Sequence, residues 1–146
     1  MMNIKGVLFD LDGTLLDTSE LIVESFRYTF KQHCNYDISV SEVHDFFGKS
    51  LRLAMETLGK DKADELIDTY REHNAKYHDE KIAIFPEVAE TIKTMYDNGI
   101  KLAVVTSKTK KTALRGLKLF GLESYFSTVI GINECINPKP HPEPVN

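Results

Sequence analysis

The distribution of apolar residues divides the chain into three parts. Residues 4–9 are mostly apolar, which predicts a short buried strand that ends at Asp10. Residues 18–80 carry apolar side chains at helical spacing, with breaks at Gly48 and Gly59, and contain no strand-like run. This middle part therefore predicts an all-helical block of about four helices.

Beyond residue 81 the pattern alternates between helices and strands. Residues 86–98 predict a helix, 100–106 a strongly apolar strand, and 127–131 a further short strand. Between the last two strands, a second helix is closed by Gly121. With the strand at 4–9, this order is typical of an α/β fold with a doubly wound parallel sheet, interrupted by the helical block.

Composition and charge narrow the possible partners. Of the 146 residues, 42% are hydrophobic and 27% charged, which is usual for a globular domain. The formal net charge of −4 argues against nucleic acid as a partner. No apolar run approaches the roughly 20 residues of a membrane span, so we expect a cytoplasmic protein without a membrane partner. Cys34 and Cys135 are expected to be reduced thiols.

Four side chains are expected to converge on one edge of the predicted sheet. Asp10, Thr106 and the proline-rich loop carrying Lys139 each follow a predicted strand, and Asp12 lies two residues beyond Asp10. Ligands of parallel sheets bind beyond the carboxyl ends of the strands. The sequence thus brings two carboxylates, a hydroxyl and an amine to one place.

Two neighbouring carboxylates suit phosphoryl transfer. Asp10 could attack phosphorus as a nucleophile, while Asp12 could protonate the leaving oxygen and later take a proton from water. Gly13 lets the backbone turn away beside them. The alternative interpretation is an ordinary polar turn, and for Thr106 it is a local backbone hydrogen bond.

These residues stand within a longer segment that resembles a known family. Val7-Leu8-Phe9-Asp10-Leu11-Asp12-Gly13-Thr14-Leu15-Leu16-Asp17-Thr18 resembles the first motif of the haloacid dehalogenase superfamily. Residues 17–26 are especially similar to pyrophosphatases of its phosphoglycolate phosphatase and inorganic pyrophosphatase branch. The resemblance implies a parallel, Rossmann-like core sheet at 1–16 and 81–146, with an inserted helical cap at 17–80.

The resemblance also assigns roles position by position. Asp10 is implied to be the nucleophile and a magnesium ligand. Asp12 is implied to be the general acid/base, with its backbone carbonyl on the metal. Thr106 matches the hydroxyl that binds the transferring phosphoryl group, and Lys139 matches the lysine that neutralises nucleophile and phosphate. The implied activity is magnesium-dependent hydrolysis of a small phosphorylated substrate.

Further residues are candidates for substrate binding. Gly13, Thr14 and Ser107 flank the implied catalytic groups. Lys108 lies near a helix start, where the macrodipole disfavours cations unless an anion is bound, although a solvated lysine is the plainer interpretation. Lys49 lies in the cap loop that closes over substrate in relatives, and it is either a substrate-facing or an exposed cation.

By the same resemblance, the family pattern continues beyond Asn146. It adds strands beside residues 4–9 and the aspartates that complete the magnesium site. We therefore expect a truncated or proteolysed form with an incomplete core, an exposed apolar edge at 4–9, and weak activity. We expect a monomer or weak homo-oligomer, with association through that edge.

Two other functions remain open. A phosphosugar mutase related to β-phosphoglucomutase would use the same Asp10 and Asp12, although Thr14 modestly favours hydrolysis. A non-catalytic fragment that acts as a binding module is the other. The sequence does not choose between phosphoglycolate, pyrophosphate and small sugar phosphates.

Overall fold

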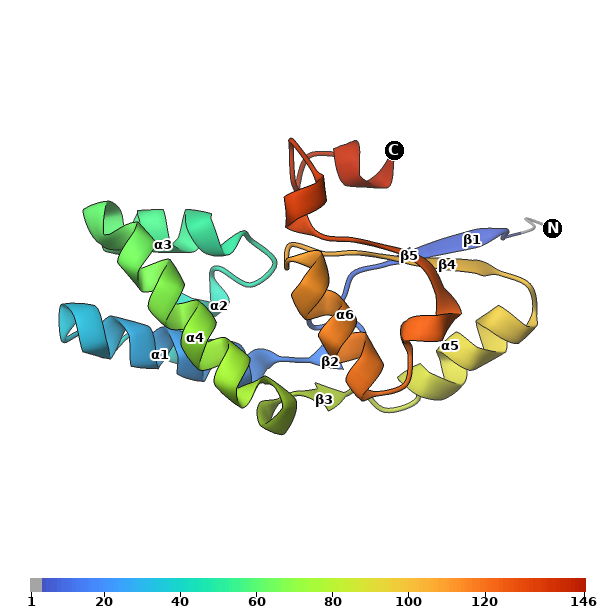
Figure 1. The fold of residues 1–146 in the computed structure, drawn as a ribbon, viewed down its shortest axis with the longest axis horizontal. Coiled ribbons are helices and arrows are strands. Elements are labelled where there is room, and N and C mark those ends of the chain that lie inside the picture. The colour runs from blue at the N-terminus through green and yellow to red at the C-terminus, as the bar shows by residue number, and fades with distance from the viewer. Residues whose placement is uncertain (1–3) are drawn as a thin grey trace. The chain divides into compact units, whose positions relative to one another are not determined.

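The computed structural model describes residues 4–146, and the chain forms two compact units (Figure 1). One unit contains the chain through Asp17 together with Ala83–Asn146, and the other is Thr18–Ile82. The expected core begins at residue 1, and its residues 1–3 lie outside the described part. Cys34 and Cys135 are both free. Among the described residues, no helix combines the length and apolar composition needed to cross a membrane.

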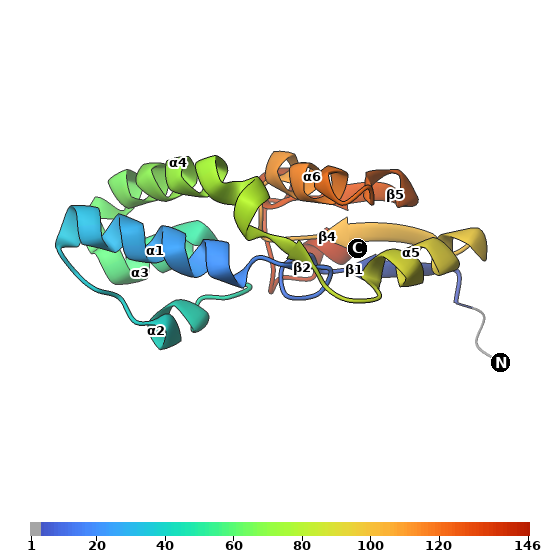
Figure 2. The same ribbon diagram turned by 90° about the horizontal axis from the view of Figure 1, so that it is seen from below.

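The first unit is built on a three-stranded parallel sheet. Its strands are β1 (Gly6–Phe9), β4 (Lys101–Val105) and β5 (Phe126–Ile130), in the order β1-β4-β5. Helix α5 (Val88–Asp97) leads into β4, and α6 (Lys110–Leu119) connects β4 to β5 and packs on β5 (Figure 2). The parallel α/β fold expected from the sequence is confirmed.

The central strand β4 carries the core of this unit. Its last four residues are all buried, as a strand flanked by neighbours on both sides requires. Ile92 of α5 and Leu117 of α6 are also buried and contribute to this core. The run at 100–106 is strongly apolar because β4 is the central strand of the sheet and is buried.

Strand β1 is less buried than its sequence predicts. Ile4 and Leu8 expose 58% and 54% of their surface. Within the described residues β1 pairs only with β4, so it is an edge strand, and its apolar side chains are only partly covered. Within the described residues, the exposed apolar edge expected at 4–9 is therefore present, whereas the full burial that the apolar run alone predicts is not.

A second, two-stranded sheet joins the two ends of the first unit's chain. Leu16 of β2 (Leu16–Asp17) pairs antiparallel with Ile84 of β3 (Ala83–Ile84). The amide of Phe85 extends the contact by donating to the carbonyl of Leu15. Strands of two residues carry no periodic signal, so the sequence did not reveal this pair.

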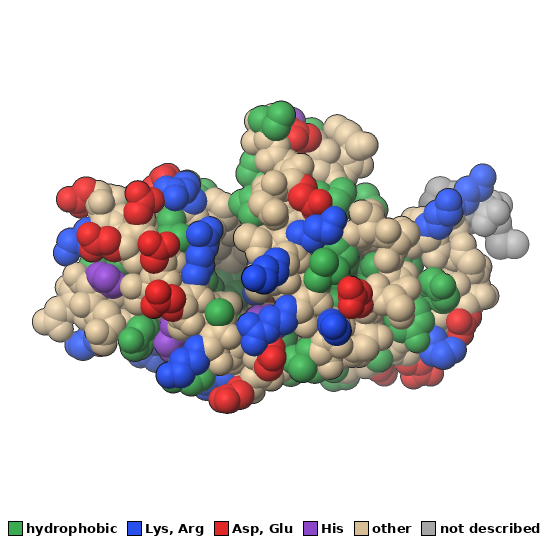
Figure 3. Space-filling view, in the orientation of Figure 1, with side chains coloured by type: hydrophobic (Ala, Val, Ile, Leu, Met, Phe, Trp, Pro, Cys, Tyr) green, Lys and Arg blue, Asp and Glu red, His purple; other side chains and the backbone are tan. Residues whose placement is uncertain are grey.

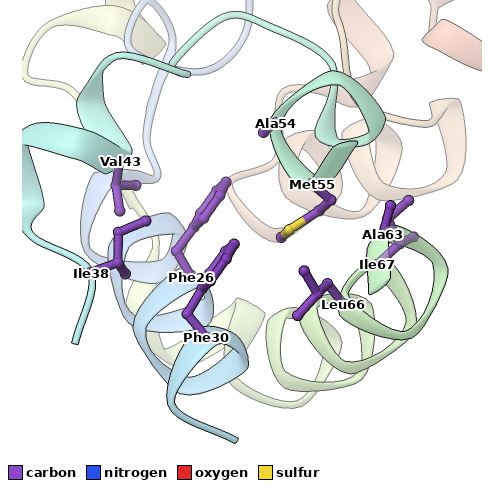
Figure 4. Packing of buried hydrophobic residues seen from close by; sticks show 9 residues of the cluster. All are labelled: Phe26, Phe30, Ile38, Val43, Ala54, Met55, Ala63, Leu66 and Ile67. Carbon is purple, nitrogen blue, oxygen red and sulfur yellow. The ribbon is translucent and has the colours of Figure 1, made fainter. Parts of the chain in front are cut away.

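The second unit is helical throughout. It contains α1 (Ser19–Cys34), α2 (Val40–His44), α3 (Leu51–Gly59) and α4 (Ala63–Lys81), with a 3₁₀ turn at Lys60–Lys62. Apolar side chains from all four helices form its core (Figure 4). The rings of Phe26 and Phe30 stack in this core with centroids 6.3 Å apart.

Gly59, the last residue of α3, lies directly against Leu66 of α4. A Cβ atom at Gly59 would lie 2.0 Å from a methyl carbon of Leu66, so a side chain there would require the Leu66 side chain to shift. The left-handed conformation that follows the helix falls instead on Lys60, with φ of 50°.

Candidate active site

Asp10 forms an ion pair with a lysine from the far end of the chain. Asp10 follows β1 directly, and the Nζ of Lys139 donates to its Oδ1 over 2.8 Å. The same Nζ donates to the carbonyl of Val105, the last residue of β4, over 3.2 Å. Lys139 is thereby held across the carboxyl ends of two adjacent strands, as the topology predicts.

Asp12 has a lysine of its own. The Nζ of Lys108 lies 3.1 Å from Oδ1 of Asp12, and the two side chains are only 17% and 22% exposed. Asp10 and Asp12 therefore carry separate counter-ions. Lys108 was predicted to be either a substrate ligand or a solvated side chain, and its contact with the Asp12 carboxylate was not predicted.

The loop that presents Asp12 is closed by its own backbone. The amides of Thr14, Leu15 and Leu16 donate to the carbonyl of Leu11. Gly13 has a φ of 76°, which favours glycine, and its amide donates to the carbonyl of Leu16. Thr14 is exposed at the tip of this turn.

Thr106 organises the loop after β4. It is only 4% exposed, and its amide donates to the carbonyl of Ile130 at the end of β5. Its Oγ1 accepts a hydrogen bond from the amide of Lys108 over 3.1 Å. The local backbone bond considered for Thr106 is therefore present. Ser107 lies between these two residues and is partly exposed.

The loop after β5 clamps the loop that carries Lys108. The amide of Ile132 donates to the carbonyl of Lys108 over 2.8 Å, and Oδ1 of Asn133 accepts from the amide of Lys110. A Cβ atom at Gly131 would lie 2.3 Å from the amide nitrogen of Lys110, so no side chain fits there. Sequence reasoning missed Gly131 and Asn133, because no local pattern marks a contact between two loops.

Basic residues continue from this loop along α6. Lys110, Lys111, Arg115 and Lys118 all belong to this helix, and Lys and Arg side chains gather over it in Figure 3. Lys110 forms an ion pair with Glu134 over 2.9 Å. This pair offsets the unfavourable interaction between a cation in the first helical turn and the helix macrodipole. Glu134, which also accepts from the amide of Gly131, has a lowered pKa, mainly because of its hydrogen bond with Lys110.

The proline-rich loop is held by Glu143. Its carboxylate accepts hydrogen bonds from the amides of Ile136 and Asn137 and from the side chain of Asn137, over 2.8–3.0 Å. These bonds, first of all that from the Ile136 amide, lower the pKa of Glu143. His141 accepts from the amide of Glu143 through Nδ1. This role of Glu143 was not predicted, because its hydrogen-bond partners meet it only once the loop is folded.

Lys49 belongs to the helical unit, between α2 and α3. Its Nζ lies 5.2 Å from the centroid of the Phe46 ring, within range of a cation–π contact. Gly48, beside it, has a φ of 78° and shapes the turn.

The donor chemistry of the first unit suits a hard cation. Magnesium is commonly held by one or two carboxylates together with substrate oxygens, and this loop offers the carboxylate of Asp10 and the backbone carbonyl of Asp12. Within residues 4–146, no group of three or more His, Cys, Asp or Glu side chains is placed to hold a metal ion. The fit therefore rests on the Asp10 carboxylate and the Asp12 carbonyl.

Known proteins resemble this chain in sequence and in structure. The family model described as haloacid dehalogenase-like hydrolase matches residues 7–146. The protein named pyrophosphatase PpaX from Halalkalibacterium halodurans is 40% identical over 99% of this chain and 67% of its own length. The protein of that name from Bacillus pumilus is 42% identical over 97% of this chain and 66% of its own length.

Solved structures share the fold. The haloacid dehalogenase-like family hydrolase from Streptococcus pneumoniae has a TM-score of 0.80 at 28% identity, covering 88% of this chain and 61% of that one. A predicted phosphoglycolate phosphatase from Haemophilus somnus has a TM-score of 0.78 at 26% identity, covering 97% and 68%. The chain thus spans about two thirds of the length of the relatives it matches.

Proposed function

Because the chain belongs to the haloacid dehalogenase-like hydrolase family, as its first motif indicated, we propose that it is the catalytic part of a magnesium-dependent phosphatase. Its substrate is pyrophosphate or a small phosphomonoester. The observation that supports this proposal best is the ion pair between Asp10 and Lys139, at the carboxyl ends of β1 and β4.

In the first step, a carboxylate oxygen of Asp10 attacks phosphorus and the bond from phosphorus to the leaving oxygen breaks. Asp12 gives its proton to that oxygen, which leaves an aspartyl phosphate on Asp10 and a carboxylate on Asp12. In the second step, Asp12 takes a proton from water as the water oxygen attacks phosphorus. Phosphate leaves, and both aspartates return to their starting states.

Lys139 makes the first step electrostatically possible. A carboxylate and a phosphate repel each other, and a cation 2.8 Å from the carboxylate offsets that repulsion as the two approach. Thr106 is proposed to donate its hydroxyl proton to a phosphoryl oxygen. Gly13, Thr14 and Ser107 would contact the same phosphoryl group.

Asp10 and the backbone carbonyl of Asp12 would hold the magnesium ion, which supplies charge neutralisation for the phosphoryl oxygens when it is bound. We propose that residues 18–82 form a cap whose Lys49 contacts the rest of the substrate. The pyrophosphatase names of the sequence relatives favour pyrophosphate, for which a cationic side chain suits the second phosphate.

The test is a phosphatase assay on the full-length protein, with pyrophosphate, phosphoglycolate and β-glucose 1-phosphate as substrates. We expect phosphate release with magnesium, its loss with a chelator, and its loss in Asp10→Asn. Mass spectrometry of acid-quenched enzyme should locate a phosphoryl group on Asp10. Undiminished phosphate release by Asp10→Asn would refute the proposed nucleophile, and conversion of the sugar phosphate to its isomer would identify a mutase.

A further inference from the structure

Lys108 is held against Asp12 in a setting that strengthens their interaction. The Nζ to Oδ1 distance of 3.1 Å is that of a charge-assisted hydrogen bond, and both side chains are largely withdrawn from water. Charges that are shielded from solvent are screened less by salt than exposed ones. The pair therefore restrains the Asp12 carboxylate more than a surface ion pair would.

The backbone of Lys108 is fixed on both sides. Its amide donates to Oγ1 of Thr106, and its carbonyl accepts from the amide of Ile132. The clamp of Gly131 and Asn133 against Lys110 fixes the next turn of chain. The main chain of Lys108 is thus held at two points, and that of Lys110 at a third, so the base from which the Lys108 side chain reaches Asp12 is fixed.

We infer that Lys108 is a positioning residue for Asp12, and that the loop after β5 sets its place. This inference rests on the proposed function, in which Asp12 moves the proton in both steps. The two lysines of the site then have different partners: Lys139 neutralises the nucleophile Asp10, and Lys108 orients the proton-transferring carboxylate of Asp12. Lys108 fixes the direction of the carboxylate through its contact with Oδ1.

Leaving groups distinguish this role from substrate binding. An alkyl phosphate such as phosphoglycolate needs a proton on its leaving oxygen, because an alkoxide is a poor leaving group, whereas p-nitrophenolate departs without one. Loss of Lys108 should therefore slow the alkyl phosphate in both steps. With p-nitrophenyl phosphate, it should leave formation of the aspartyl phosphate nearly unchanged and slow only its hydrolysis.

The experiment compares Lys108→Met, Lys108→Arg and Lys111→Met in the full-length protein by steady-state and rapid-mixing kinetics. Lys111 is an exposed lysine in the first turn of α6, three residues after Lys108, and serves as the matched control. For Lys108→Met, we expect kcat on phosphoglycolate to fall about 10-fold to 100-fold with little change in KM, as for a misplaced catalytic group. With p-nitrophenyl phosphate, we expect a burst of p-nitrophenolate equal to the enzyme concentration, followed by slow turnover.

Lys108→Arg keeps the cation and should recover part of kcat, and Lys111→Met should match the wild type. If Lys108→Met instead raises KM for every substrate and weakens inhibition by inorganic phosphate, Lys108 binds substrate and the inference is wrong. An unchanged kcat on phosphoglycolate would also overturn it.

Two controls separate the possible failures. Circular dichroism of each variant excludes unfolding as the cause of a lost rate. Asn133→Ala keeps Lys108 but removes the bond to the Lys110 amide, and it should reproduce a milder form of the Lys108→Met kinetics. A wild type that is inactive on all substrates would refute the proposed function itself, and this inference with it.

Discussion

Lys139 and Asp10 are separated by 129 residues in the chain, yet their Nζ and Oδ1 atoms are 2.8 Å apart. The lysine reaches the aspartate because β1 and β4 are neighbours and its Nζ also rests on the last carbonyl of β4. The contact therefore depends on the register of the sheet as much as on the two side chains.

Removal of this cation should strongly impair the proposed reaction. We expect Lys139→Met to lower kcat about 100-fold to 1,000-fold, since one preorganised charge partner of the phosphoryl group is lost. Lys139→Arg should recover only part of the rate, because a planar guanidinium does not replace a compact ammonium group. Lys118→Met on α6 is the control, and steady-state phosphate release is the measurement. Equal kcat for Lys139→Met and Lys118→Met would contradict this role.

Glu143 should make the proline-rich loop sensitive to acid. Its pKa is lowered in the fold by hydrogen bonds from Ile136 and Asn137, so its stabilising contribution is present above its unfolded pKa of 4.5. The contribution is lost as pH falls through the lower, folded value. In Glu143→Gln this part of the acid dependence should disappear. Urea unfolding between pH 7 and pH 3 measures the unfolding free energy of both proteins. Identical pH profiles for the variant and the wild type would exclude a contribution from Glu143.

His73 should make the helical unit less stable in mild acid. Burial lowers its pKa from 6.5, with opposing effects from Glu24 and reinforcing ones from Lys76 and Lys81, and its Nδ1 lies 3.0 Å from Oγ of Ser25. A depressed pKa on a base means that the unfolded chain binds the proton more readily. The stabilising contribution of neutral His73 is therefore fully present above pH 6.5, and it is lost as pH falls from 6.5 through the lower pKa of the folded state.

Urea unfolding of the wild type and His73→Gln at pH 8 and pH 5.5 tests this dependence. The wild type should lose more stability between the two pH values than the variant does. A loss of equal size in both proteins would assign the effect to other groups.

The helical core should be sensitive to truncation of its buried leucine. Leu66 is fully buried against Gly59, so Leu66→Ala should cost about 2–5 kcal/mol of unfolding free energy. Leu53 is 49% exposed and provides the same substitution on the surface, where the cost should be about 0.5 kcal/mol or less. Urea denaturation measures both values, and similar costs would show that the core in Figure 4 is not what stabilises this unit.

The sequence predicted those features that depend on local pattern. The apolar run of β4 and the amphipathic helices are visible residue by residue, and the family resemblance led to Asp10, Asp12 and Lys139. The β2–β3 pair, the Gly131 clamp and the three bonds to Glu143 were not predicted. Each depends on backbone groups that meet only after the chain has folded, and no side-chain pattern announces them.

Strands β2 and β3 place Asp17 directly opposite Ala83, so the chain leaves the sheet-bearing unit and returns to it at one point. The helical unit is thus a compact insertion between two paired residues of the other unit. A short turn joining Asp17 to Ala83 would replace the helical unit without breaking any strand of the three-stranded sheet. The helical unit can therefore be exchanged for another insertion while the sheet still brings Asp10 and Lys139 together.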